Sequence, residues 1–328
     1  MENKKFGLVL ELPRPEDYIL GSEAKLGGSQ WTKLIKEEIV DGERTLSWKK
    51  WEPEAELQRK ATETNACVSF SGNNGAEYLV NLECERDKVV LVALESVGLM
   101  KNGKFNASDR RTAKGSGTNP NEGNTVRAVD DYIRHNLFCP EDLWPFAESM
   151  GVSEYYSVMP AEVADYGKKV KPILEFETKY VPVAGGIQMQ VSSVEQLWDA
   201  LQYSPVWVSV DGGNYQQVTN YSHRVIIRGA VWGKYWEIHD SYQNQIVQLP
   251  WDYRFGGAKA FQIIKKNLPE FIQVGPAILF LAKSGKYAGQ YVGYGDGDVA
   301  KAIEGIYHKH RTTLDNIPQN YAGSLFIK

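Results

Sequence analysis

The chain has 328 residues, and 42% of them are apolar, which is enough for a sizeable hydrophobic core. Its 37 basic and 41 acidic side chains are spread along the sequence and give a net charge of -4, so we expect neither nucleic acid nor a membrane as a partner. No apolar run reaches the about 18 residues of a membrane span, and FGLVLEL near the start is too short for the apolar region of a signal peptide. The totals therefore predict a soluble protein without a signal peptide.

Three cysteines occur in the chain, at Cys67, Cys84 and Cys139. An odd number of cysteines at no metal-like spacing argues against a disulfide framework and against a zinc site. We therefore expect reduced thiols and neither a metal nor another cofactor.

The chain begins with residues 1–50, which are rich in aromatic and charged side chains and lack sustained periodicity, so we predict an extended N-terminal arm. The main predicted domain spans residues 51–267. It opens with a helix over residues 67–82, although Gly72 and Gly75 each cost a helix roughly 1 kcal/mol relative to alanine. Packing against the core must offset that cost.

A polar stretch over residues 99–124 shows no period, and loops of this length are usually functional or disordered. It leads into a surface helix in TVRAVDDYIRHN, for which Asn124 or Thr125 is the expected cap. Further on, Ser192 and Glu195 have the spacing of a capping box in front of another amphipathic helix.

After this helix, short runs rich in β-branched and aromatic residues alternate with turns. The runs are PVWVSV, RVIIRGAV, KYWEIH and NQIVQL, and they predict an antiparallel sheet. Two more such runs, AILFLAKS and GQYVGYG, precede a helical pattern near the end, so residues 268–328 are predicted to form a small appended βα module. The predicted fold class is α+β, with a helical half and a half made of a barrel-like antiparallel sheet.

The second and third runs of the sheet predict a hairpin around Trp232-Gly233. With a two-residue turn there, Arg228 faces Glu237 and Ile227 faces Ile238, and both pairings are favourable. In this register His223 and Asp240 are diagonal neighbours on the apolar face of the ribbon, about 7–8 Å apart at most. His239 points to the opposite face.

A His–Asp pair on the buried side of a sheet can simply be a satisfied pair in the core, and a cysteine alone is most often a small buried hydrophobe. Cys67, however, lies in the first turn of its predicted helix if Asn65 is the cap, where the helix dipole favours a thiolate. Together, Cys67, His223 and Asp240 have the composition of a nucleophile, a base and a group that orients the base.

The order of these residues resembles that of the papain-like cysteine peptidases. The number of residues between Cys67 and His223 along the sequence is close to the roughly 130–150 residues that separate the cysteine and the histidine in that family. CVSF at residues 67–70 resembles the family's Cys-Trp-Ala-Phe-like helix start, and Asp240-Ser241-Tyr242 stands where the family has Asn-Ser-Trp. The pattern WKKWEPEAELQ followed by ETNACVSFS most resembles papain-like proteins encoded by bacteriophages. The resemblance covers about residues 45–265.

The resemblance implies a thiol peptidase in which Cys67 attacks the substrate, His223 transfers the proton and Asp240 orients the histidine. It implies that Gln58 donates to the oxyanion, although this glutamine lies nine residues before the cysteine and thus farther than the family's pattern; Asn65 is the alternative donor. The arm is too short to resemble an inhibitory pro-segment, so no zymogen step is expected. The resemblance also implies that the substrate cleft is lined by Gly115, Ser116, Gly117, Gly123 and Asn124.

Two other functions stay open at this point. The chain could instead be a structural or assembly component of a phage virion that keeps a papain-like shell for binding, or a hydrolase of peptidoglycan crosslinks. The expected partners are accordingly a polypeptide substrate or phage structural proteins, with oligomers inside a virion as one arrangement. The expected location is the host cytoplasm during synthesis and then the virion.

Overall fold

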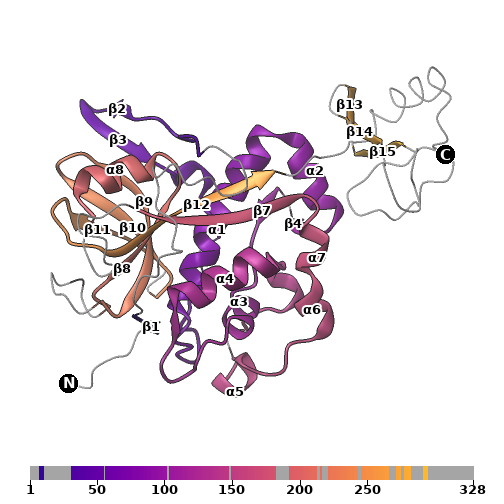
Figure 1. The fold of residues 1–328 in the computed structure, drawn as a ribbon, viewed down its shortest axis with the longest axis horizontal. Coiled ribbons are helices and arrows are strands. Elements are labelled where there is room, and N and C mark those ends of the chain that lie inside the picture. The colour runs from indigo at the N-terminus through magenta and orange to yellow at the C-terminus, as the bar shows by residue number, and fades with distance from the viewer. Residues whose placement is uncertain are drawn as a thin grey trace.

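The computed structural model describes twelve stretches of the chain: residues 7–10, 31–54, 56–101, 103–147, 149–181, 192–212, 215, 221–242, 245–265, 271–274, 277–281 and 291–294. Its main body has a half made of helices and a half made of an antiparallel sheet (Figure 1). Within the described residues, no helix is long and apolar enough to cross a membrane.

The helical half is built around one long helix, α1, which contacts helices α3 and α4 on one side and strands β9 and β12 of the sheet on another. Helix α1 is buried along most of its length, and glycine permits this close packing. A Cβ atom on Gly75 would lie 2.3 Å from the ring of Phe261 in β12. The helices are α1 (Cys67–Arg86), α2 (Lys88–Ser96), α3 (Asp109–Gly115), α4 (Val126–Asn136), α5 (Val152–Tyr155), α6 (Ala161–Asp165), α7 (Gly167–Val170) and the short turns η1 (Lys49–Trp51) and η2 (Glu141–Leu143).

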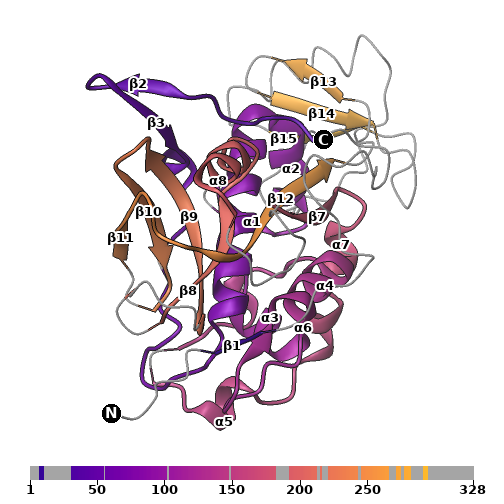
Figure 2. The same ribbon diagram turned by 60° about the vertical axis from the view of Figure 1, so that its left-hand side comes forward.

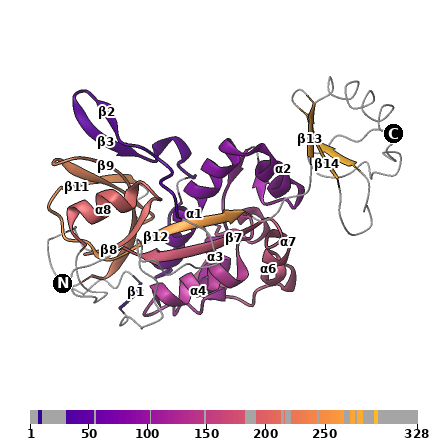
Figure 3. The same ribbon diagram turned by 45° about the horizontal axis from the view of Figure 1, so that its top comes forward.

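The second half is an eight-stranded sheet with the order β11-β10-β9-β8-β12-β7, to which β3 adds on β9 and β2 adds on β3. All its neighbouring strands are antiparallel. Helix α8 (Val194–Leu201) contacts β8, β9 and β12. On the side of the helical half, strand β12 contacts α1 and strand β7 contacts α4 (Figure 3). The strands are β2 (Glu38–Val40), β3 (Glu43–Ser47), β7 (Leu174–Tyr180), β8 (Val206–Val210), β9 (His223–Val231), β10 (Tyr235–Asp240), β11 (Gln245–Pro250) and β12 (Gly256–Lys265).

The predicted α+β architecture is confirmed, and the predicted helix caps need two corrections. The residue at the N-cap of α1 is Ala66 and not Asn65, because Asn65 has a positive φ of 52°. The capping box of α8 consists of Ser193 and Gln196, one residue later than the predicted pair. The cap of α4 is Thr125, whose side chain accepts from the Ala128 amide at 3.1 Å.

The β9–β10 hairpin keeps the predicted register where it matters for the site. A β-turn with Trp232-Gly233 at its centre is present, but the strands pair from Val231 and Tyr235, which leaves one extra residue after the turn. Before the bulge the pairing is shifted by one residue, so Glu237 faces Gly229 and not Arg228 as predicted. A bulge between Glu237 and Ile238 compensates for the extra residue, so Ile238 faces Ile227 as predicted. Because the two irregularities cancel, the far end of the ribbon has the predicted alternation of faces.

Four short strands form two small ladders outside the main sheet. Strand β1 (Leu8–Val9) pairs in parallel with β6 (Asn124–Thr125), and β4 (Met100–Lys101) pairs with β5 (Lys104–Phe105). Of the expected arm, residues 38–47 supply β2 and β3 and so extend the main sheet.

Near the end of the chain, a separate three-stranded sheet is formed by β13 (Phe271–Val274), β14 (Ala277–Leu281) and β15 (Tyr291–Tyr294). The helix expected after it lies outside the described residues.

Candidate active site

The site lies where helix α1 begins and where two strands of the sheet end. Cys67 is the first residue of α1, and His223 and Asp240 are the first residue of β9 and the last of β10. The amide N–H groups in the first turn of a helix have no partner within the helix, and they carry the positive end of its dipole. Cys67 therefore sits where a negative charge is stabilised.

His223 and Asp240 form the hydrogen-bonded pair expected from the hairpin. His223 Nε2 lies 2.7 Å from Asp240 Oδ1, and both side chains are almost fully buried. Two further groups donate to the carboxylate: the Tyr242 amide to Oδ1 at 2.8 Å, and the Tyr215 hydroxyl to Oδ2. Burial alone would raise the pKa of Asp240, but the charge and the hydrogen bond of His223, with those of Tyr215 and Tyr242, hold it below its usual value.

The pKa of His223 is raised to about 10. Burial opposes this shift, while the attraction of Asp240, the hydrogen bond to Asp240, and then a hydrogen bond and charge interaction with Cys67 produce it. Because Asp240 holds Nε2, the nitrogen left for the sulfur is Nδ1. At neutral pH the imidazole is therefore protonated, between a carboxylate on one side and the cysteine on the other.

The other histidine of the ribbon, His239, points to the opposite face, as predicted. Its Nδ1 lies 3.2 Å from the hydroxyl of Tyr78 on α1, and the two rings meet edge to face. Burial and the charge of Arg228 lower its pKa to about 4, against a smaller raising effect of Asp240. His239 is thus a neutral core residue at physiological pH.

Gln58 is fully buried and joins the segment before α1 to the segment after Asp240. Its side-chain oxygen accepts from the Ser241 hydroxyl at 3.1 Å, and its backbone N–H donates to the Ser241 carbonyl at 3.0 Å. Its side-chain amide donates to Glu63 at 3.3 Å. Gln58 therefore lies beside the residue that follows Asp240, and its role as an oxyanion donor stays a prediction.

Asn65, the alternative donor, lies two residues before the cysteine. Its side-chain amide donates to the carbonyl of Pro120 at 2.6 Å, and its backbone N–H donates to Glu63 Oε1 at 3.0 Å. Glu63 thus accepts from both candidate donors, a role that the sequence did not indicate. The contact with Pro120 fixes the loop around residues 116–124 against the start of α1.

The glycines of the predicted cleft residues have separate structural roles. Gly115 ends α3 and packs on α4, because a Cβ atom there would lie 2.1 Å from the ring of Tyr132. Gly117 has a φ of +79° and nothing within 4 Å of a Cβ position. Gly123 has a φ of +91°, and a Cβ on it would lie 1.9 Å from the Gly7 carbonyl oxygen.

The two polar residues of the set hold the loop together. The side-chain amide of Asn124 donates to the Ser116 hydroxyl at 2.9 Å and to the Thr118 hydroxyl at 3.1 Å. The loop is therefore an ordered wall beside the start of α1, with Gly123 facing the N-terminal strand β1.

Cys84 and Cys139 are placed away from any such arrangement. Burial raises the pKa of each thiol to about 12. Their exposed fractions, 2% and 1%, are close to the 0% of Cys67, so burial does not distinguish the three thiols. Within the described residues, no group of three or more His, Cys, Asp and Glu side chains is arranged to hold a metal ion.

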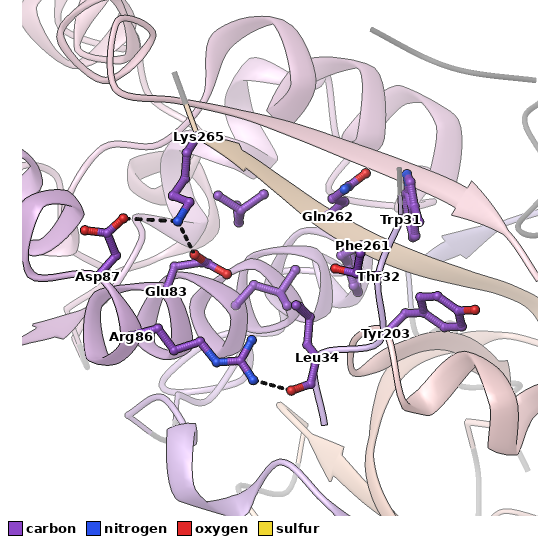
Figure 4. A pocket seen from close by; sticks show the side chains of 12 residues that line it. Trp31, Thr32, Leu34, Glu83, Arg86, Asp87, Tyr203, Phe261, Gln262 and Lys265 are labelled. Atoms are coloured by element: carbon purple, nitrogen blue, oxygen red, sulfur yellow. Dashed lines mark hydrogen bonds and ion pairs between the residues drawn. The ribbon is translucent and has the colours of Figure 1, made fainter. Parts of the chain in front are cut away.

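A cavity of about 390 Å³ lies near the other end of α1 (Figure 4). Glu83, which lines it, is roughly 24 Å along the helix from Cys67 at 1.5 Å per residue. Lys265 closes one side of the cavity with ion pairs to Asp87 at 3.0 Å and to Glu83 at 3.6 Å. None of the residues expected in the site lines this cavity, so it is separate from the cysteine and the histidine.

Tyr215 and Tyr242 are the residues of the site that the sequence analysis missed in their present roles. Tyr215 lies between β8 and β9 in the chain and has no motif around it in the sequence. Tyr242 was compared with an aromatic residue of the family's motif, but its contribution here includes a backbone N–H, which no side-chain pattern reveals.

Comparison with known proteins gives matches among solved structures alone. No family model matches the chain, and no curated protein sequence matches it. Among the structural neighbours, bromelain from Ananas comosus, in complex with the inhibitor E64, is 14% identical, with a TM-score of 0.43 over 68% of this chain and 98% of its own.

Two further neighbours give similar values. The ragweed pollen cysteine protease Amb a 11, in its proform, is 14% identical, with a TM-score of 0.44 over 72% of this chain and 68% of its own. Xylellain, a cysteine protease from Xylella fastidiosa, is 15% identical, with a TM-score of 0.47 over 80% of this chain and 96% of its own.

Proposed function

We propose that the protein is a papain-like thiol peptidase that cleaves peptide bonds with Cys67, His223 and Asp240. The observation that carries the proposal is the buried pair of His223 and Asp240, hydrogen-bonded at 2.7 Å, together with a cysteine at a helix start that helps to raise the pKa of the same imidazole. The N–H groups at a helix start stabilise negative charge on a sulfur, and a protonated imidazole next to the sulfur can act as an acid. We further propose, from the sequence resemblance alone, that the protein is encoded by a bacteriophage.

The reaction begins with His223 protonated and Cys67 as the thiolate. The sulfur attacks the carbonyl carbon of the substrate, and the carbonyl π electrons move to the oxygen. The N–H groups at the start of α1 stabilise this oxyanion, with an amide from Gln58 or Asn65 as the second donor; comparable donors are worth about 3–4 kcal/mol. His223 then gives its proton to the leaving amine as the C–N bond breaks.

The thioester between Cys67 and the acyl part of the substrate is resolved by water. His223, now neutral, takes a proton from the water as it attacks the thioester carbonyl. The C–S bond breaks, the carboxylic acid is released, and the proton on His223 restores the starting pair. Throughout, Asp240 stays ionised and holds the ring through Nε2, so that Nδ1 keeps facing the sulfur.

A binding role without catalysis is the second candidate, and the position of Gln58 favours it. Both ends of this side chain are engaged, the oxygen by Ser241 and the amide by Glu63. An amide used in this way contributes less to an oxyanion site than one whose hydrogens are aimed at substrate. Under this alternative the chain is a virion or assembly component that keeps the papain-like shell.

Hydrolysis of an unfolded polypeptide by the purified protein separates the two candidates. The peptidase proposal predicts cleavage that is lost in Cys67→Ala and retained in Cys84→Ala, which changes a thiol of similar burial. Release of muropeptides from peptidoglycan, assayed in parallel, would assign the same chemistry to crosslinks instead. If neither substrate is cleaved, the binding role is the better description.

A further inference from the structure

The reactive groups of the site are covered. Cys67 is 0% exposed and His223 is 1% exposed, so a substrate carbonyl can reach the sulfur only when this arrangement opens. A peptidase of this kind needs an open groove at these residues in order to bind an extended chain.

Residues 7–10 of the chain run past the segments that precede Cys67 and His223. Strand β1 is next to β6 in the loop wall, and the Asn124 amide donates to the Gly7 carbonyl at 2.8 Å. On the other side, the Leu8 amide donates to the carbonyl of Ser222, the residue before His223, at 3.4 Å. Figures 1 and 2 both show β1 between the sheet half near β8 and the helical half near α3.

Gly7 is held closely between two backbones. It has a φ of +89°, and a Cβ on it would lie 2.1 Å from the carbonyl oxygen of Asn65, two residues before Cys67. From the other direction, a Cβ on Gly123 would lie 1.9 Å from the Gly7 carbonyl oxygen. The segment thus touches Asn65, two residues before the cysteine, and Ser222, directly before the histidine, and at Gly7 the passage admits glycine alone.

The contacts that hold the segment are of a kind that any extended peptide can make. The donors and acceptors are backbone groups of Asn124 and Ser222. When a peptide is added as a strand in this way, its main-chain hydrogen bonds give affinity, and the room for its side chains gives specificity. Because residues 7–10 belong to the same chain, they compete with free peptides at a high effective concentration.

We propose that residues 7–10 occupy the peptide-binding cleft of their own chain and exclude other peptides from Cys67, and that the cleft selects glycine at the position of Gly7. This inference rests on the proposed function in treating the cleft as a peptide site. Four residues suffice because they run between Asn65, near the cysteine, and Ser222, next to the histidine.

The test compares Gly7→Ala with Gly42→Ala in the full chain. Both glycines have a strongly positive φ, +89° and +82°, but a Cβ on Gly42 meets nothing within 4 Å. The two variants therefore share the backbone strain and differ in the collision with Asn65. The measurement is the rate at which a thiol-reactive peptide epoxide modifies Cys67.

The proposal predicts that Gly7→Ala raises this rate at least about tenfold over the unaltered chain, because the tethered competitor is expelled, and that Gly42→Ala leaves it unchanged. Equal rates in all three proteins would overturn it. Since Leu8 packs against the core, Leu8→Asp is a second way to displace the segment, and it should have the same effect as Gly7→Ala. Circular dichroism and thermal unfolding identify any variant that fails to fold.

A synthetic peptide with the sequence KFGLVLEL tests the glycine requirement. Added to the Gly7→Ala protein, it should slow labelling of Cys67, while the same peptide with alanine in place of glycine should not. These readouts do not depend on turnover. If labelling responds as described but no variant cleaves a polypeptide, the proposed function fails and the assignment of the cleft stands. If the unaltered chain and Gly7→Ala cleave a polypeptide equally well and are labelled equally fast, the assignment of the cleft fails and the proposed function stands.

Discussion

The two histidines of the β9–β10 ribbon are both buried, yet their pKa values move in opposite directions. His223 is raised to about 10 and His239 is lowered to about 4. His239 meets a tyrosine hydroxyl and lies near the positive charge of Arg228, so burial prevails and the ring stays neutral. His223 meets the carboxylate of Asp240, which outweighs the same burial. A charged partner, and not depth in the core, decides which of the two can serve as an acid.

The largest difference between the two histidines should be in catalysis. We expect His223→Asn to lower the rate of polypeptide cleavage by about 10²–10⁴-fold, the range for removal of a positioned acid–base group. His239→Gln, which keeps a hydrogen-bonding side chain near Tyr78, should lower it less than about tenfold. Cleavage rates of the purified variants check this, and equal losses in both would remove the distinction between the two faces.

The next effect concerns the charge behind His223. Asp240→Asn keeps the shape and a hydrogen-bond acceptor but removes the negative charge, so the pKa of His223 should fall by roughly 1–3 units. Titration of the His223 ring by NMR measures this shift directly. The pKa of His239 should change little, because the charge of Asp240 is the smallest of its influences. A His223 pKa that stays in place would mean that the carboxylate is not what raises it.

The pH dependence of stability should also separate the two rings. His223 has a raised pKa in the folded state, so its stabilisation is present below about pH 6.5 and is lost as the pH rises toward 10. His239 has a lowered pKa, so its stabilisation is present above about 6.5 and is lost as the pH falls toward 4. Urea unfolding from pH 4 to 10 should show that His239→Gln flattens the acid side of the stability profile and leaves the alkaline side in place. A flattened alkaline side would contradict the assignment.

The smallest effect is expected from Tyr215→Phe. This change removes the hydroxyl that donates to Asp240 Oδ2, while the His223 and Tyr242 contacts remain. A hydrogen bond to a charged group is worth about 1.5–3 kcal/mol at most, and its loss is shared between protonation of Asp240 and stability. We expect a several-fold decrease in cleavage rate and a small rise in the pKa of Asp240. A loss as large as that of His223→Asn would place Tyr215 in direct contact with the substrate.

Much of the sheet half could be predicted from the sequence because its signals are local. Runs of β-branched residues marked the strands, and the pairing of Ile227 with Ile238 fixed the face on which His223 lies. The extra residue after the turn and the compensating bulge could not be predicted, because an insertion on one strand becomes visible only when the other strand is in place. Their cancellation explains why the simple register still brought His223 and Asp240 together.

The helical half and the position of residues 7–10 beside the site could be predicted less well from the sequence. Gly75 reads as a weak point of a helix until Phe261, far along the chain, is seen against it. Asparagine is a common helix cap, but Asn65 has a left-handed backbone conformation and lies outside the helix. There it lies close to Gly7 and donates a hydrogen bond to Pro120. Strand β1 has two residues, too few for any periodic signal, and its partner β6 is just as short.

The central claim is that Cys67 is activated by an imidazolium held by Asp240. Its most direct test is the rate at which iodoacetamide modifies each of the three cysteines of the native protein at neutral pH, followed by mass spectrometry of the peptides. Since all three are buried to a similar degree, the rates report their electrostatic surroundings. We predict that Cys67 reacts at least about tenfold faster than Cys84 and Cys139 and that His223→Asn abolishes the difference. Equal rates for the three thiols, or a fast Cys67 that is indifferent to His223→Asn, would contradict it.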